Sequence, residues 1–301
     1  MKGRYCTSSL ALCLFGGLLL AGCGTEDTGS TTGGRDGQET SLRVEGSDTM
    51  VNLAQAWAET YKGKRADISV EVSGGGSGVG IASLINGTCD MANASRKMKD
   101  EELQNAVEEH GIEPVEHIVG FDALAVYVHK DNPVDSISIE ELAEIYGDGG
   151  QITDWSQIEN GADLEITRVS RQNNSGTYAY FREAVLGKAR DYKLGSIDQS
   201  GSKDVVALVS KTPGAIGYSG MGYATPEVKM LKICQKKGET AVAPTVANAV
   251  SGDYPITRPL HIYTLGDAEG LMAEYLEWIL SSEGQAVVTE LGYVPVSDRD
   301  E

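Results

Sequence analysis

The sequence predicts an α/β protein with largely parallel sheets, arranged in about two domains or lobes. Apolar, strand-like segments alternate with amphipathic, helix-like segments along most of the chain, which is the order that βαβ units produce. The length of 301 residues corresponds to about two domains of ~150 residues each. A hydrophobic content of 41% beside 23% charged residues is ordinary for a folded chain and argues against global disorder.

The first 22 residues predict a signal peptide. Lys2 and Arg4 precede an apolar run over residues 10–20, which is too short for a comfortable bilayer span. Small residues lead into Cys23, and this arrangement resembles the lipobox of bacterial lipoproteins. The resemblance implies that Cys23 is lipidated with several acyl chains and anchors an exported protein to the cell membrane. A plain signal peptide with an incidental cysteine is the alternative.

Residues 23–41 are expected to form a flexible tether, because residues 24–40 contain no large apolar side chain. The formal charge is −19, and removal of Lys2 and Arg4 with the signal takes it to −21. Such acidity argues against nonspecific nucleic-acid binding. The N-terminal run is the one long apolar segment of the sequence, which excludes a polytopic membrane protein.

The first part of the folded chain alternates strands and helices. Leu53, Trp57 and Tyr61 share one helical face, and residues 123–128 form a near-continuous apolar strand. Burial of that strand on both faces is typical of a helix-covered parallel sheet. The expected strands are 42–44, 68–72, 89–94 and 123–128, and the expected helices are 50–62, a helix around 81–85, and 100–110.

The second part continues the same alternation. Ser138 and Glu141 form a capping box that begins a helix, and Ser202 is expected to cap another. Two helices separated near residues 281–282 are expected to end the fold. The remaining expected elements are strands at 164–169, 215–218 and 260–263, and a helix that opens with Tyr178 and ends at Gly187.

Three strand-to-helix turns carry the candidate chemistry: residues 46–50, 74–78 and 171–177. Each has small hydroxyl residues where a helix begins, and a helix N-terminus exposes unpaired N–H groups with a partial positive charge. The carboxyl ends of strands are where α/β sheets bind ligands. Arg171 adds a guanidinium that can fork onto two anion oxygens. Converging turns of this kind would form an anion-binding cradle.

These turns, together with Ala94-Ser95-Arg96 and Pro213–Tyr218, resemble in order and spacing the PstS-type phosphate-binding proteins of phosphate ABC importers. The similarity covers about residues 42–297. It implies a two-lobed, periplasmic-binding-protein-like clamp, in which each lobe is a mainly parallel sheet flanked by helices. The expected lobes are 42–124 plus 260–301, and 125–259, which close over an anion by hinge bending.

The resemblance also implies which residues bind phosphate. Well-known members carry an aspartate after the Ala-Ser pair that accepts the phosphate proton, where this chain has Arg96. Arg96 is then either a second clamp or a brace, and Asp48 is a candidate for the proton acceptor. The implied phosphate-binding residues are Ser47, Asp48, Thr49, Met50, Ser77, Gly78, Arg96, Arg171, Ser175, Gly176 and Thr177.

The implied function is high-affinity binding of inorganic phosphate and its delivery to an ABC permease and ATPase complex, by a monomer without catalysis or a cofactor. The alternatives are a receptor for another tetrahedral oxyanion or a phosphate ester, a phosphatase-like enzyme, and a lipoprotein acting as a sensor or adhesin. An enzyme would need a nucleophile–base pair or a metal cluster, and the sequence presents neither.

The remaining cysteines and histidines do not suggest a metal site. Cys89 and Cys234 survive processing in an oxidising compartment, and their spacing fits no metal motif. Separate buried thiols are the favoured interpretation, and a disulfide between them is the alternative. The four histidines are scattered through the sequence without metal-ligand spacing.

Overall fold

The computed structural model describes residues 40–296. Within that range, nine strands form one sheet in the order β2-β1-β3-β11-β4-β8-β6-β7, with β9 paired to β4, while β10 and β5 form a separate pair. The predicted signal peptide, Cys23 and nearly all of the predicted tether lie outside the described residues. The strands are β1 (Thr40–Gly46), β2 (Ile68–Ser73), β3 (Met91–Ala94), β4 (Pro114–His129), β5 (Ser136–Ser138), β6 (Thr167–Arg171), β7 (Ile197–Gln199), β8 (Ala215–Gly220), β9 (Val228–Met230), β10 (Lys232–Cys234) and β11 (Thr257–Leu265).

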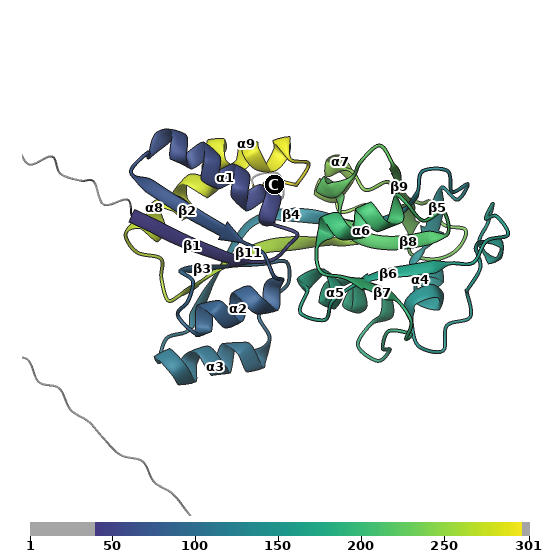
Figure 1. Ribbon diagram of the computed structural model, residues 1–301, viewed down its shortest axis with the longest axis horizontal. Helices are drawn as coiled ribbons and strands as arrows, with labels where there is room; N and C mark the ends of the chain where they lie inside the picture. The colour runs from purple at the N-terminus through teal and green to yellow at the C-terminus, as the bar shows by residue number, and fades with distance from the viewer. Residues whose placement is uncertain (1–39, 297–301) are drawn as a thin grey trace, which may run out of the picture. The chain divides into compact units, whose positions relative to one another are not determined.

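Helices cover both faces of the sheet at each end (Figure 1). We call β1, β2 and β3 with α1, α2, α3, α8 and α9 the β1 half, and β6, β7 and β8 with α4, α5, α6 and α7 the β8 half. No helix within the described range is both long and apolar enough to cross a membrane. The helices are α1 (Val51–Lys64), α2 (Ser77–Ile85), α3 (Asp100–His110), α4 (Ile139–Tyr146), η1 (Trp155–Gln157), α5 (Gly176–Phe181), η2 (Arg182–Leu186), α6 (Ser202–Val209), η3 (Met221–Tyr223), α7 (Val246–Val250), α8 (Leu271–Leu280) and α9 (Ser282–Glu290).

Two long strands, β4 and β11, connect the halves. The outer pairs β1–β2, β1–β3, β6–β7 and β6–β8 are parallel, as the α/β pattern predicts. The expectation of parallel pairing around residues 123–128 is wrong, because β4 runs antiparallel to β11, β8 and β9. Helices α6 and α7 pack against β4. An apolar strand therefore indicates that other layers pack on both of its faces, but it does not indicate whether its neighbours are parallel or antiparallel.

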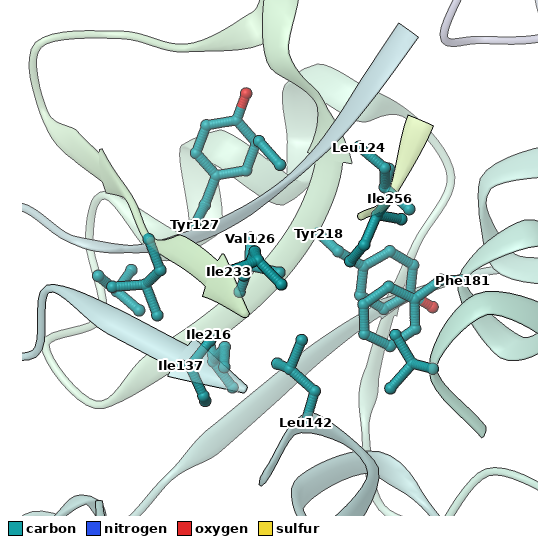
Figure 2. Close-up of a cluster of buried hydrophobic side chains, with 14 of the residues drawn as sticks. Leu124, Val126, Tyr127, Ile137, Leu142, Phe181, Ile216, Tyr218, Ile233 and Ile256 are labelled. Atoms are coloured by element: carbon teal, nitrogen blue, oxygen red, sulfur yellow. The ribbon is translucent and has the colours of Figure 1, made fainter. Parts of the chain in front are cut away.

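The β8 half is built around one large hydrophobic cluster that includes residues 123–128, in the C-terminal half of β4 (Figure 2). Leu124 and Val126 are fully buried there, and the rings of Phe181 and Tyr218 stack with centroids 3.8 Å apart. In the β1 half, separate clusters lie on the two faces of the sheet. Leu53 and Trp57 of α1 belong to one of them, and Ile81 of α2 to the other. These cores hold the ends of the strands in fixed positions.

Helix boundaries follow local sequence signals closely. The Ser138 hydroxyl accepts the Glu141 N–H at 3.1 Å, and the Glu141 carboxylate accepts the Ser138 N–H at 3.0 Å, so the predicted capping box is confirmed. The predicted helix from Tyr178 is α5 followed by a π-helical turn, η2. The prediction for Ser202 is off by one residue, because Gly201 is the N-cap and Ser202 is the first residue of α6.

The two cysteines between residues 40 and 296, Cys89 and Cys234, are unpaired and buried. Cys89 packs with the α2 cluster of the β1 half, and Cys234 ends β10. The prediction of separate buried thiols is confirmed. Burial raises the pKa of Cys89 to about 12, which makes its thiolate scarce at neutral pH.

Candidate functional site

The first turn, between β1 and α1, lies against the end of β3. The Ser47 N–H donates to Asn93 O at 2.9 Å, and Gly46 has a φ of +142°. A Cβ at Gly46 would lie 2.2 Å from Asn93 O, so only glycine allows this approach. Thr49 and Met50, which follow in the same turn, are fully buried. The Met50 N–H donates to Ser47 O at 2.9 Å and stabilises the turn.

The second turn, between β2 and α2, places Ser77 beside Ser95. Ser77 begins α2, and its hydroxyl accepts the Ser95 N–H at 3.0 Å. The Ser47 hydroxyl donates to Ser95 Oγ at 2.9 Å, and Ser77 Oγ lies 3.4 Å from Ser95 Oγ. Ser95 therefore links the first and second turns.

The third turn, between β6 and α5, brings the β8 half to the same place. Ser175 caps α5 by accepting the Thr177 N–H at 3.2 Å, and Thr177 Oγ1 lies 2.9 Å from Thr49 Oγ1. A Cβ on Gly176 would lie only 2.3 Å from Ser77 Oγ. The three turns thus converge on what we call the hydroxyl cluster: Ser47, Thr49, Ser77, Ser95 and Thr177, all nearly inaccessible to solvent.

An ion pair that the sequence patterns did not predict, between Arg258 and Asp122, lies against this cluster. Arg258 on β11 is the register partner of Asp122 on β4, and Asp122 Oδ2 accepts from its Nη2 at 2.9 Å and its Nε at 3.2 Å. Arg258 Nη2 also lies 3.1 Å from Thr49 Oγ1 and 3.0 Å from Thr177 Oγ1. Burial raises the pKa of Asp122, while the adjacent guanidinium acts in the opposite direction.

A signal for this pair does exist in the sequence. Asp122 is the one charged residue within the stretch 118–128, and Arg258 stands between Ile256 and Leu260, which are both buried. Charged residues are almost never fully buried unless they are paired. An acid and a base in two buried strands could therefore have been proposed as partners.

Arg171 is also buried, but its donors have other acceptors. Its Nη2 donates to Asp48 Oδ2 at 2.9 Å and to Ser200 O at 2.7 Å, and its Nη1 donates to Ser202 Oγ at 3.1 Å. Burial lowers the pKa of Arg171, and Asp48 acts against this shift. Asp48 in turn accepts the Gly75 N–H at 3.0 Å, so this pair ties the second turn to the third.

Arg96 lies beside Gly78, and its guanidinium is directed to Glu102 and Lys97. Its two Nη atoms donate to the two carboxylate oxygens of Glu102 at 2.8 and 2.7 Å, and Nη1 also donates to Lys97 O. Burial acts to raise the pKa of Glu102, but Arg96 and the Lys99 N–H outweigh it and lower that pKa. The Gly78 N–H donates to Asn174 O at 3.1 Å. This geometry favours the brace over the clamp for Arg96.

The arrangement is a set of hydrogen-bond donors with a guanidinium, which suits a small oxyanion. Among residues 40–296, no three His, Cys, Asp or Glu side chains gather closely enough to hold a metal ion. A cavity of about 900 Å³ lies elsewhere, between α3 and the start of β4, and includes none of the predicted site residues. The chemistry is therefore concentrated where the three turns meet.

Comparison with known proteins gives consistent results. The PBP superfamily domain matches residues 26–283. The chain is 36% identical to a phosphate-binding protein PstS of Pseudomonas aeruginosa over 270 residues, which cover 83% of this chain and 81% of that protein. It is 33% identical to the PstS of Bacillus subtilis, with 93% and 91% covered.

A solved structure from Clostridium perfringens, described as a phosphate ABC transporter substrate-binding protein with bound phosphate, aligns with a TM-score of 0.77 at 30% identity. The alignment covers 85% of this chain and 100% of that one. An ABC-type phosphate transport receptor from Vibrio cholerae aligns at 27% identity with a TM-score of 0.66 and the same coverage. The predicted α/β, periplasmic-binding-protein-like fold class is confirmed.

Proposed function

The chain belongs to the PBP superfamily and, within it, to the family of PstS phosphate-binding proteins, and from this we propose that it binds inorganic phosphate for an ABC importer without catalysis. The observation that carries the proposal is the convergence of three helix beginnings from both halves on one buried cluster of hydroxyls. Helix N-termini with small hydroxyl residues are natural anion sites.

The anion site consists of donors from both halves of the sheet. Thr49 and Ser77 act from the β1 half, and Thr177 acts from the β8 half; Ser175 and Arg171 hold the third turn in place. Of the residues predicted from the sequence, these are the ones to which we assign a role in binding, and Arg96 acts as a brace. A net charge of −19 slows the encounter with an anion at low salt but does not prevent binding, because short hydrogen bonds in a buried site decide affinity.

The two lobes of the proposal are 42–124 plus 260–301, and 125–259, with β4 and β11 as the hinge strands. Closure of the lobes would bury phosphate, and the ligand would favour the closed state by its higher affinity for it. The exported monomer would be anchored to the membrane by lipid on Cys23 and would pass phosphate to the permease and ATPase. The long polar segment after Cys23 suits such a tether.

Titration calorimetry on phosphate-free protein tests the proposal. We expect phosphate to saturate one site per chain and sulfate to bind more weakly. Thr49→Val and Thr177→Val, which remove one hydroxyl each, should weaken phosphate binding by about 10-fold, because a hydrogen bond to a charged group contributes ~1.5 kcal/mol or more. Thr60→Val is the matched control, because Thr60 Oγ1 donates to Ala56 O on α1, away from the cluster.

Two results would contradict this function. Protein freed of ligand that gives no heat with millimolar phosphate does not bind it as a transport receptor must. Tighter binding of a phosphate ester or of another tetrahedral oxyanion would assign the site to that ligand instead.

A further inference from the structure

The guanidinium of Arg258 lies against the hydroxyl cluster and contacts both of its threonines. Its Nη2 is within 3.1 Å of the hydroxyls of Thr49 and Thr177, and its Nη1 donates to Ser95 O at 3.2 Å. Thr49 and Ser95 belong to the β1 half, and Thr177 belongs to the β8 half. We propose that Arg258 contacts the bound phosphate directly and supplies its positive partner, an inference that rests on the phosphate-binding function proposed above.

The hydrogen-bond balance around Nη2 supports this role. The atom carries two hydrogens, but three oxygens lie within reach: Asp122 Oδ2 at 2.9 Å, Thr177 Oγ1 at 3.0 Å and Thr49 Oγ1 at 3.1 Å. The two threonine hydroxyls, 2.9 Å apart, can share one hydrogen bond between them. An anion oxygen that accepts from both threonines and from Nη2 would give every one of these donors an acceptor.

Asp122 prepares the guanidinium for such a contact. Its Oδ2 accepts from both Nε and Nη2 of Arg258, which fixes the plane of the guanidinium, and the two side chains are 0% and 1% exposed. A buried arginine without a partner would be costly, so the carboxylate lets a charge reside here before any anion arrives. The donors of Arg258 that face the threonines then require no reorganisation on binding.

The donors of the other two arginines, Arg171 and Arg96, do not face the hydroxyl cluster. The N–H groups of Arg171 are directed to Asp48, to Ser202 and to backbone carbonyls, and those of Arg96 to Glu102 and Lys97 O. Neither donates to a hydroxyl of the cluster among the contacts found in residues 40–296. Arg258 is thus the arginine whose position matches that of an anion held by the three turns.

The test uses a double variant that preserves packing. Arg258→Ala alone would leave Asp122 buried without its partner, so Arg258→Gln is combined with Asp122→Asn to remove both charges while keeping polar side chains of similar size. Calorimetry of the full, phosphate-free chain should show phosphate binding about 10- to 100-fold weaker than in the unmodified protein. Arg65→Gln is the control, because Arg65 forms exposed ion pairs with Asp67 and Glu274.

Arg258→Lys serves if the double variant fails to fold, as judged by circular dichroism. It keeps a positive charge opposite Asp122 but loses the planar fork, so we expect phosphate binding to weaken by about 10-fold. Folded variants that bind phosphate within twofold of the unmodified protein would overturn the assignment of Arg258. Absence of phosphate binding in the unmodified protein would instead overturn the proposed function, so the two failures are distinguishable.

Discussion

Two arginine–aspartate pairs border the hydroxyl cluster, and they differ in burial. We call Arg258–Asp122 the inner pair and Arg171–Asp48 the outer pair. In both, a nearly inaccessible arginine donates from Nη2 at 2.9 Å, but the aspartate side chain is 0% exposed in the inner pair and 17% exposed in the outer one. If the arginine is removed, water can therefore solvate the aspartate of the outer pair but not that of the inner pair.

The surroundings reinforce this contrast. A cavity of about 200 Å³, lined by Asp48, Ser202 and Tyr223 among others, lies beside the outer pair. The inner pair joins β4 to β11 and contacts both threonines of the cluster. We infer that the inner pair governs stability and anion contact together, whereas the outer pair chiefly orients the third turn.

The largest expected effect comes from breaking the inner pair. Arg258→Ala should lower the free energy of unfolding by about 3–5 kcal/mol, because it leaves the Asp122 carboxylate buried and uncompensated. Arg171→Ala should cost less, about 1–3 kcal/mol, because the remaining Asp48 is partly hydrated. Urea denaturation of both variants measures the difference, and equal losses would contradict the distinction between the pairs.

The next effect concerns pH, because β11 also carries a buried histidine three residues after Arg258. Burial lowers the pKa of His261 to about 4, while the neighbouring Glu116 acts to raise it. The unfolded chain protonates this residue near pH 6.5 and so binds more protons between pH 6.5 and 4. The free energy of unfolding should fall by ~3 kcal/mol over that range as pH decreases.

His261→Gln isolates this contribution. Denaturation at pH 7.5, 6 and 4.5 should show a shallower decline in the variant than in the unmodified protein, while His110→Gln, at an exposed histidine, should follow the unmodified curve. An unchanged slope in His261→Gln would assign the acid sensitivity to other groups, the inner pair included.

A smaller effect on stability is expected from a substitution at Gly176, which lies where the two halves meet. A Cβ on Gly176 would lie 2.3 Å from Ser77 Oγ and 2.5 Å from Ser95 Oγ. Gly176→Ala should therefore push the third turn away from the cluster and cost ~1–3 kcal/mol in stability, with weaker phosphate binding. Gly63→Ala in α1 is the matched control, since a Cβ there meets nothing within 4 Å and should stabilise the helix by up to ~1 kcal/mol.

Much of this geometry could be predicted from local sequence. The capping box at Ser138 and the three turns depend on neighbouring residues and appear where the patterns place them. The direction of β4 could not be predicted, because an apolar run indicates burial on both faces but not which strands pair with it.

The inner pair could not be predicted with certainty because it, too, depends on which strands are neighbours. Asp122 and Arg258 are 136 residues apart, and only the register between β4 and β11 makes them partners. For the outer pair, both residues were predicted as site residues because Asp48 and Arg171 lie in candidate turns, but the hydrogen bond between them was not predicted. Residues chosen for the ligand thus turn out to have protein partners that decide their orientation.

The smallest effect sharpens the role of the outer pair. Asp48 has one oxygen accepting from Gly75 N–H and the other from Arg171, yet each retains a lone pair for a further donor. If Asp48 accepts the proton of hydrogen phosphate, Asp48→Asn should reduce the preference for phosphate over fully ionised sulfate, by several-fold, because an amide can donate to sulfate where a carboxylate repels it. Competition calorimetry with both anions at two pH values measures this ratio. An unchanged ratio, with only a modest loss of stability, would remove Asp48 from discrimination and leave it as the support of Arg171, which is the role its partly hydrated position already permits.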